Sequence, residues 1–214
     1  MRITGDILEP TNSTNITVPN GMGINVGNTE LIEFASSGLL NQTPGSIIES
    51  LWSVCDGSTH VLNSGSYTVQ NVTAVQTLSA TYADINGSSI TYIPPTSATK
   101  VVYRFSYSSY WVSGSHSILH HKFFIDGSEV LHARFNRSAT YNEQRYTFEW
   151  VIGIGGGANS NTGRQAIWNS GKTLKMQARW YGSGNDANLH GTTYWDGGSG
   201  NQFSIPIINI IAIR

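Results

Sequence analysis

Three histidines, His116, His120 and His121, lie close together in the middle of the chain and are its first candidates for metal binding. On a strand, His116 and His120 would share a face, and imidazole is a common zinc ligand. A zinc site needs three or four ligands, and only Asp126 is near enough to add one. We therefore predict no metal site, with His121 hydrogen-bonded and half-buried and His120 at the surface or an interface.

Two glycine-containing segments match nucleotide-binding loops only in part. Residues 153–158 fit the pattern G-x-G-x-x-A, but the residues after them favour a loop, whereas a pyrophosphate site needs a helix there. Gly171-Lys172-Thr173 ends like a phosphate-binding loop, yet Ala166 stands where its first glycine belongs. The sequence predicts neither a nucleotide site nor any other cofactor.

The sequence also lacks the arrangement of a hydrolase. No G-x-S-x-G segment places a serine as a nucleophile. A glycosidase needs two carboxylates at a defined separation, which a sequence does not reveal. The carboxylates of the C-terminal half that could form such a pair are Glu129, Glu143, Glu149, Asp186 and Asp196. We predict that the protein is not an enzyme.

Aromatic residues in glycine- and asparagine-rich segments point to another kind of chemistry. Tyr181 lies in one such segment, and Tyr194, Trp195 and Asp196 lie in another. Aromatic rings stack on the apolar faces of sugars, while neighbouring polar groups bind the hydroxyls. These four residues are our candidates for glycan contact. The alternative is that the rings fill the ends of the folded domain.

The elements that carry these residues are predicted to be strands. Apolar and polar residues alternate in 100–111 and 118–126, which is the pattern of half-buried strands. The predicted inward residues of the two segments are Val101, Tyr103, Phe105, Tyr107, Leu119, His121, Phe123 and Ile125. Asp126 and Gly127 favour a two-residue hairpin turn, and we expect a return strand with Leu131, Ala133 and Phe135 inward.

The alternation recurs in 144–152 and 173–181, and strong helix formers are scarce. About eight to ten strands at this spacing predict an all-β fold, an antiparallel β-sandwich that is most simply a jelly roll. Hydrophobic residues make up 39% of the 214 residues, which is enough for a core. A net charge of -1 with 11% aromatic residues argues against global disorder.

The two ends of the chain depart from this pattern. Residues 1–45 contain three prolines, scattered glycines and little apolar material, and we expect an extended arm that needs a partner to order it. Residues 46–214 form the predicted sandwich. The last strand is apolar on both faces, and its isoleucines are Ile207, Ile208, Ile210, Ile211 and Ile213. The core of one chain accounts for one face only, so we predict that these residues form a subunit interface.

Charge and composition exclude further classes of partner. Residues 100–214 carry eleven basic and six acidic residues, and this net +5 is too dilute for nucleic acid. The chain contains no run of 18 apolar residues, so the sequence predicts no membrane span. The single cysteine, Cys55, rules out an intrachain disulfide and is expected to be a small buried hydrophobe.

Residues 45–214, about four-fifths of the chain, contain a set of short motifs. They are GSIIESL (45–51), SVCDG (53–57), ITYIPP (90–95), FIDG (124–127), ARFNR (133–137), TGRQA (162–166), YWDG (194–197) and the isoleucine-rich last strand. As a set they resemble a C-terminal domain of virion proteins of marine and freshwater tailed phages of the cyanophage type.

The resemblance implies a trimeric jelly-roll-like domain on the particle surface, without catalytic residues. By analogy with fibres, residues 1–45 would dock the homotrimer to a capsid or tail protein of the virion, after synthesis in the host cytoplasm. The absence of a long shaft favours a capsid decoration or a short fibre. The alternative is a tail-fibre adhesin that recognises host surface glycans.

Overall fold

The computed structural model describes residues 23–26, 29–33, 44–111, 117–139, 144–182, 187–192 and 202–214. The chain divides into two units, Met1–Pro44 and Gly45–Arg214. In the first unit, β1 (Gly23–Val26) pairs antiparallel with β2 (Thr29–Glu33). Within the described ranges, no helix is long and apolar enough to cross a membrane.

Eight strands of the second unit pair as the arms of one long folded hairpin would. In chain order they are β3 (Ile47–Val54), β8 (Ile90–Tyr92), β9 (Lys100–Trp111), β10 (Ser117–Ile125), β12 (Phe135–Ala139), β13 (Gln144–Gly153), β14 (Lys172–Trp180) and β18 (Ile207–Ile213). The first pairs with the eighth, the second with the seventh, the third with the sixth and the fourth with the fifth, always antiparallel. This pairing is that of a jelly roll, so the predicted fold class is confirmed.

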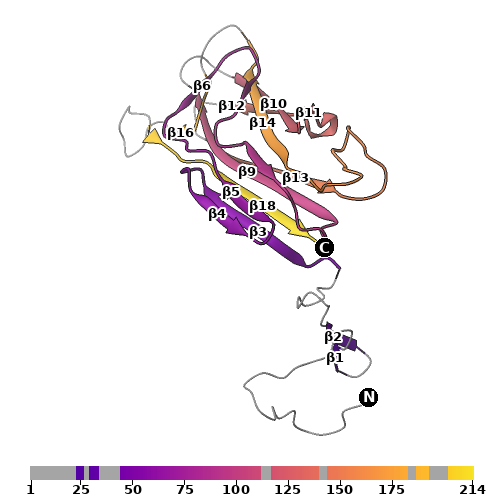
Figure 1. Ribbon diagram of the computed structural model, residues 1–214. Coiled ribbons are helices and arrows are strands. Elements are labelled where there is room, and N and C mark those ends of the chain that lie inside the picture. The colour runs from indigo at the N-terminus through magenta and orange to yellow at the C-terminus, as the bar shows by residue number, and fades with distance from the viewer. Residues whose placement is uncertain are drawn as a thin grey trace. The chain divides into compact units, whose positions relative to one another are not determined.

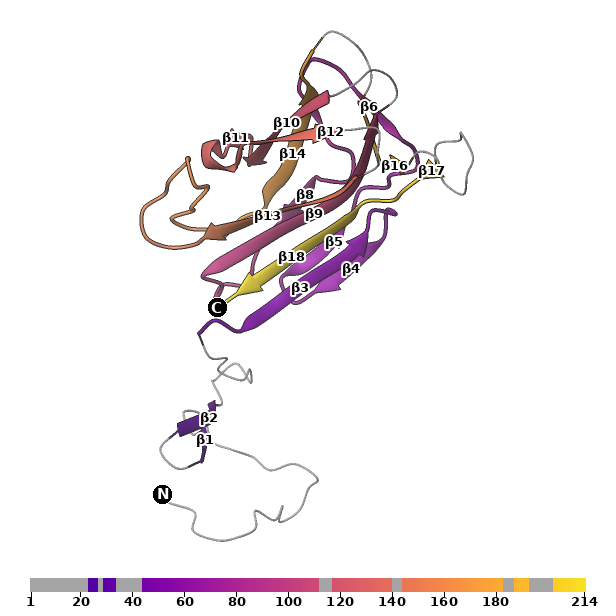
Figure 2. The same ribbon diagram turned by 180° about the vertical axis from the view of Figure 1, so that it is seen from behind.

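The eight strands form two sheets that face each other (Figures 1 and 2). The first sheet has the order β3-β18-β9-β13, and the last residues of β9 also pair, on the edge opposite β13, with β15 (Ala187–Leu189), which pairs in turn with β6 (Gln76–Leu78). The second sheet has the order β12-β10-β14-β8, with the short strands β11 (Ser128–Glu129) and β7 (Ala83–Asp84) at its edges. Two further hairpins lie outside these sheets, β4 (Thr59–Leu62) with β5 (Gly65–Thr68) and β16 (Gly191–Thr192) with β17 (Gln202–Phe203).

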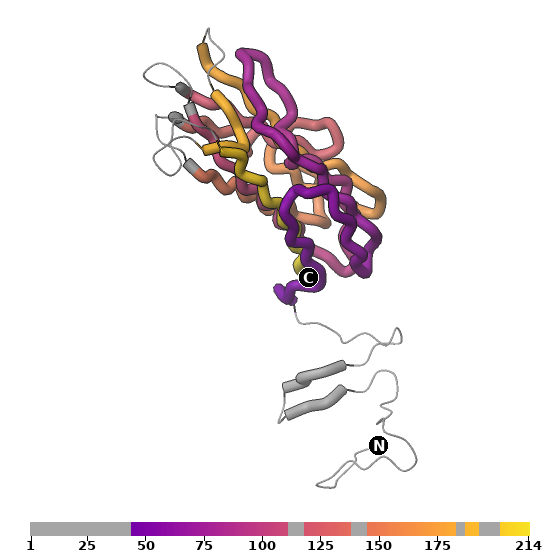
Figure 3. Tube along the Cα trace, turned by 90° about the vertical axis from the view of Figure 1, so that its left-hand side faces the viewer, coloured from indigo at the N-terminus to yellow at the C-terminus, as the bar shows by residue number. Residues whose placement is uncertain are grey.

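The two ends of the second unit meet at one end of the sandwich. Figure 3 shows the C-terminus beside the start of β3, and the Arg214 amide donates to the Ser46 carbonyl at 3.0 Å. The residues that follow Pro44 are therefore held by the last strand.

The core between the sheets follows the predicted alternation. All eight residues predicted to face inward from 100–111 and 118–126 are buried, as is Cys55. In β13 and β14 the inward residues are likewise buried, apart from Trp150, which is only partly so. Period-two alternation was enough to place these side chains because each of these strands covers a continuous core.

The segment after the 126–127 turn differs from the prediction in part. Asp126 and Gly127 have positive φ values of 51° and 79°, as a tight hairpin turn requires, which confirms the turn. The return strand β11, however, lasts only two residues, and a short 3-10 helix, η1 (Leu131–Ala133), follows it. Leu131 is 42% exposed, so its predicted inward position was wrong, because strand alternation does not continue through a 3-10 turn.

The last strand, β18, is an interior strand between β3 and β9. Ile208 and Ile210 are fully buried in the core of the chain itself, so the prediction that these two residues contact a neighbouring subunit is corrected. Ile207, Ile211 and Ile213 lie on the opposite face and are partly exposed. Their contact with another subunit stays a prediction.

Candidate functional surfaces

The outer face of the first sheet is a regular array of apolar and polar side chains. The strand register sets three rows across β3, β18, β9 and β13. The rows are Val54–Ile207–Ser106–Thr147, Trp52–Asn209–Arg104–Glu149 and Ser50–Ile211–Val102–Val151. We call this array the apolar face.

Trp52 dominates the apolar face. Its side chain is 58% exposed, and the Arg104 guanidinium lies over its ring at 5.9 Å. Arg104 Nε also donates to Glu149 Oε2 at 2.7 Å. A depression of about 450 Å³ is lined by these three residues together with Arg145, Ile207 and Asn209. The exposed tryptophan thus lies beside the Arg104–Glu149 ion pair.

Asn209 is the least expected residue of this face. It is only 1% exposed, and its Nδ2 donates to the Leu51 carbonyl at 2.7 Å. Its Oδ1 has no hydrogen-bond donor among the residues that the structure describes. Leaving a buried acceptor unsatisfied costs about 1–3 kcal/mol. Asn209 was not among the predicted site residues, although a single asparagine within a run of isoleucines is a visible signal.

The outer face of the second sheet has a different chemistry. The register places Asn136, His120 and Arg179 side by side on β12, β10 and β14. The Tyr82 ring lies against two cations, with Lys122 Nζ at 4.4 Å and Arg179 Cζ at 5.2 Å from its centroid.

A pocket of about 470 Å³ opens beside this ring. It is lined by Tyr82, His120, His121, Arg134, Phe135 and Asn136, and we call it the basic pocket.

The positive charges around the basic pocket exceed the negative ones. Glu129 accepts from Arg134 Nε at 2.5 Å and from Lys122 Nζ at 3.1 Å. The bond from Arg134, followed by that from Lys122, outweighs desolvation and lowers the pKa of the Glu129 carboxyl. Arg179 has no carboxylate partner within the described ranges, and its Nε is buried without an acceptor there.

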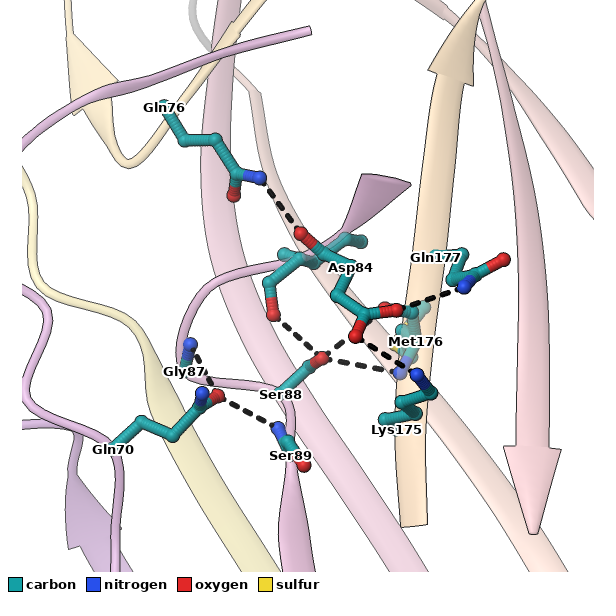
Figure 4. Close-up of polar contacts among 10 residues, drawn as sticks. Gln70, Gln76, Asp84, Gly87, Ser88, Ser89, Lys175, Met176 and Gln177 are labelled. Carbon is teal, nitrogen blue, oxygen red and sulfur yellow. Dashed lines mark hydrogen bonds and ion pairs between the residues drawn. The ribbon is translucent and has the colours of Figure 1, made fainter. Parts of the chain in front are cut away.

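Tyr82 is positioned by the segment that follows it. Asp84 binds Lys175 and Gln177 of β14, each at 2.8 Å (Figure 4). The buried Ser88 hydroxyl donates to the Ile85 carbonyl at 2.7 Å and accepts from the Met176 amide at 3.1 Å. These bonds join residues 84–88 to β14 and so anchor the segment that follows Tyr82 beside the basic pocket. Figure 4 also shows Gln70 and Gln76 bonded to the same segment.

The structure separates the predicted histidine cluster. His120 lies on the outer face, where the Tyr181 ring stacks on it at 5.3 Å, whereas His121 is buried in the core. His121 bonds the Tyr107 hydroxyl and stacks on Phe135 at 4.3 Å, and burial lowers its pKa to about 3. It is therefore more deeply buried than predicted. His116 lies outside the described residues, and in the described part no group of three His, Cys, Asp or Glu could hold a metal ion.

The predicted glycan residues are placed only in part. Tyr181 is 59% exposed, next to the basic pocket through its stacking on His120. Tyr194, Trp195 and Asp196 lie outside the described residues. Of the carboxylates considered for hydrolysis, Glu129 and Glu149 are engaged in separate ion pairs, and Glu143 and Asp186 also lie outside the described ranges.

Comparison with known proteins yields no family assignment. No protein-family model matches the chain, and no curated protein matches it. Among solved structures, a structure of infectious bursal disease virus, Gx strain, shares 11% identity and a TM-score of 0.35, covering 91% of this chain and 43% of that one. The VP2 subviral particle of the same virus shares 13% identity and a TM-score of 0.34, covering 95% and 49%. The chain thus spans less than half the length of either, and a likeness this distant does not indicate function.

Proposed function

We propose that this protein is a structural component of a virus particle and takes no part in catalysis. In this proposal it is a homotrimeric capsid decoration or short fibre protein of a tailed phage, located in the virion. Residues 1–45 dock it to a capsid or tail protein. Support comes from the motif set in residues 45–214, from the jelly-roll pairing and, above all, from the apolar face.

The apolar face suits contact with a second copy of the chain. Trp52 and Val54 on β3 are 58% and 40% exposed, and Val151 on β13 is 51% exposed on the same sheet face, an amount of exposed apolar surface that suits an interaction site. The face carries both signs of charge, since Arg104 and Arg145 lie near Glu149. The outer face of the second sheet is mainly cationic and would repel its own copy. Of the two outer faces, the apolar face is therefore the better suited to contact another copy of the chain.

Solution mass tests the proposal directly. We expect light scattering at micromolar concentration to give about three times the 23.3 kDa chain mass. Trp52→Glu should shift the protein to monomer, because it places a charge in the apolar contact. The matched control is Val61→Glu, since Val61 is 81% exposed but lies on β4, outside the apolar face.

A wild-type monomer of 23.3 kDa would refute the trimer. Equal loss of assembly in both variants would refute the role of the apolar face. Deleting residues 1–44 should still give a trimer, with three times the mass of the shortened chain, but should abolish incorporation into particles. Retained incorporation would exclude the arm as the docking segment.

A second candidate function is that of a tail-fibre adhesin that recognises host surface glycans. One observation favours it: the exposed Tyr181 ring is stacked on His120 at the basic pocket. A stacked, exposed ring beside polar groups is the arrangement that binds sugars. Binding on a glycan array that is lost with Tyr181→Ala would support this candidate, and a blank array would remove it.

A further inference from the structure

We propose that the basic pocket binds an acidic saccharide, with the sugar ring on the aromatic side chains and its anionic group on Arg179 and Arg134. The inference rests on the adhesin function above and goes beyond it by naming the ligand class and the side chains that select it.

The first argument is the charge that the pocket leaves unbalanced. Arg134 lines it, and Lys122 and Arg179 lie against the ring of Tyr82, which also lines it. Glu129 is the one carboxylate that bonds any of these three cations in the described part of the chain. Because Glu129 is shared between Lys122 and Arg134, three positive charges meet one negative charge. An anionic ligand would complete this set.

The second argument is the state of Arg179. Its Nη2 lies 3.4 Å from His120 Nδ1, and its Nε is buried with no acceptor among the described residues. A guanidinium normally binds a carboxylate through two parallel N–H groups, and hydrogen bonds between charged groups are the stronger kind. Arg179 therefore has unused donor capacity directly behind Tyr82 and His120, two residues that line the pocket.

The third argument is the aromatic surface, which a simple anion site does not need. The Tyr181 ring is 59% exposed and lies nearly parallel to the His120 ring, at an interplanar angle of 23°. Tyr82 forms another part of the wall, and Asn136 adds an amide that can both donate to and accept from sugar hydroxyls. The flat rings suit the apolar side of a sugar ring, the amide suits its hydroxyls, and the guanidinium groups suit the anionic group of an acidic sugar.

The dimensions also favour a saccharide over a nucleic acid. The volume of about 470 Å³ is within the range of small-ligand sites. Nucleic acid needs a basic stripe that follows several phosphates, and here the cations converge on one depression.

The test is to titrate the full chain with three probes and to measure the binding by isothermal titration calorimetry. The probes are an oligosaccharide of glucuronic acid, a glucose oligosaccharide of the same length, and inorganic sulfate. We expect the acidic oligosaccharide to bind at least about tenfold more tightly than either of the others, and more weakly at high salt.

Three variants locate the binding. Arg179→Gln should weaken it by about tenfold, because a charge-assisted hydrogen bond to the ligand is lost. Tyr181→Ala should weaken it by about threefold to tenfold through loss of stacking. Lys172→Gln is the matched control, since Lys172 lies at the other end of β14 and pairs with Asp126, and we expect no change.

Each other outcome overturns the inference in a distinguishable way. Equal binding of the neutral oligosaccharide removes the acidic class but leaves the adhesin function. Sulfate binding as tight as the oligosaccharide reduces the pocket to an anion site. No binding of any probe removes the inference, while a trimer mass would still support the structural role. If Arg179→Gln does not fold, Arg134→Gln serves instead, because the Arg134 side chain is 55% exposed.

Discussion

At the scale of single residues, the buried polar groups divide into satisfied and unsatisfied ones. Glu49 is only 7% exposed, and its carboxylate accepts from the Ser64 amide at 2.9 Å, the Ser64 hydroxyl at 2.5 Å and the Tyr92 hydroxyl at 2.6 Å. It thereby connects β3 to β8 and to the turn between β4 and β5. Asn209 lacks such a set. The Glu49 carboxylate is therefore a structural link, whereas the Asn209 amide is only half satisfied, through its bond to the Leu51 carbonyl.

Removing the Glu49 carboxylate should destabilise the domain strongly. Glu49→Ala leaves the Tyr92 hydroxyl and the Ser64 amide without their acceptor, and we expect a loss of about 2–4 kcal/mol in the free energy of unfolding. The control is Glu149→Ala, which breaks an ion pair whose side chains are 37% and 44% exposed and should cost below about 1 kcal/mol. Urea unfolding measures both, and losses of equal size would contradict the assignment.

At the scale of elements, the β10–β11 hairpin packs closely against a distant loop. Gly127 and Gly163 have nearly the same positive φ, 79° and 76°. A Cβ on Gly127 would meet nothing within 4 Å, whereas a Cβ on Gly163 would lie 2.8 Å from Ile125 Cδ1 and 3.1 Å from Val130 Cγ2. Gly163 therefore allows the loop before β14 to contact the hairpin, which accounts for a glycine in the motif at 162–166.

This pair of glycines separates backbone strain from steric overlap. Gly127→Ala should cost about 1–2 kcal/mol, the penalty of a left-handed backbone alone. Gly163→Ala should cost a further 1–3 kcal/mol or so, because the added methyl group overpacks the hairpin contact. Thermal or urea unfolding of the two variants gives the difference. Equal losses in the free energy of unfolding would show that the loop moves away from the hairpin without an energetic cost.

At the scale of the whole domain, the two sheets bury two histidines between them and expose chemically different outer faces. Burial lowers the pKa of His121 to about 3 and that of His190 to about 4, from an ordinary value of 6.5. Both rings are therefore neutral in the folded protein near pH 5, whereas they are protonated in the unfolded chain.

The stability of the domain should accordingly fall as pH falls from 7 to 5. Because the folded-state pKa values are lowered, the histidine contribution is complete above pH 6.5 and is lost as pH decreases toward the folded values, by roughly 1–2 kcal/mol per histidine at pH 5. Urea midpoints measured at pH 7 and pH 5 check this. His190→Gln should reduce the pH dependence, and His132→Gln, at an exposed position, should not. A flat profile for the wild type would contradict the burial of both rings.

Much of the fold could be predicted because its signals are local. Alternation along β9, β10, β13 and β14 indicated which side chains enter the core, and the Asp126–Gly127 pair indicated its hairpin. Leu131 was misplaced because only tertiary contacts shorten β11 to two residues. Tyr181 was found as an exposed aromatic residue, but Tyr82, Arg179 and Asn136 were not, since they come from three different segments that only strand pairing brings together.

By itself, the sequence determined the fold class, the inward residues of the long strands and the exclusion of an intrachain disulfide, because these depend on period-two burial and residue counts. Tertiary structure decided what the isoleucine-rich strand does. A strand can be apolar on both faces because both faces pack within its own chain or because one face contacts another subunit. Only the position of β18 between β3 and β9 shows that Ile208 and Ile210 belong to the core while Ile207 and Ile211 face outward. It also decided where Trp52, Asn209 and Arg104 meet, because strand register joins residues far apart in sequence.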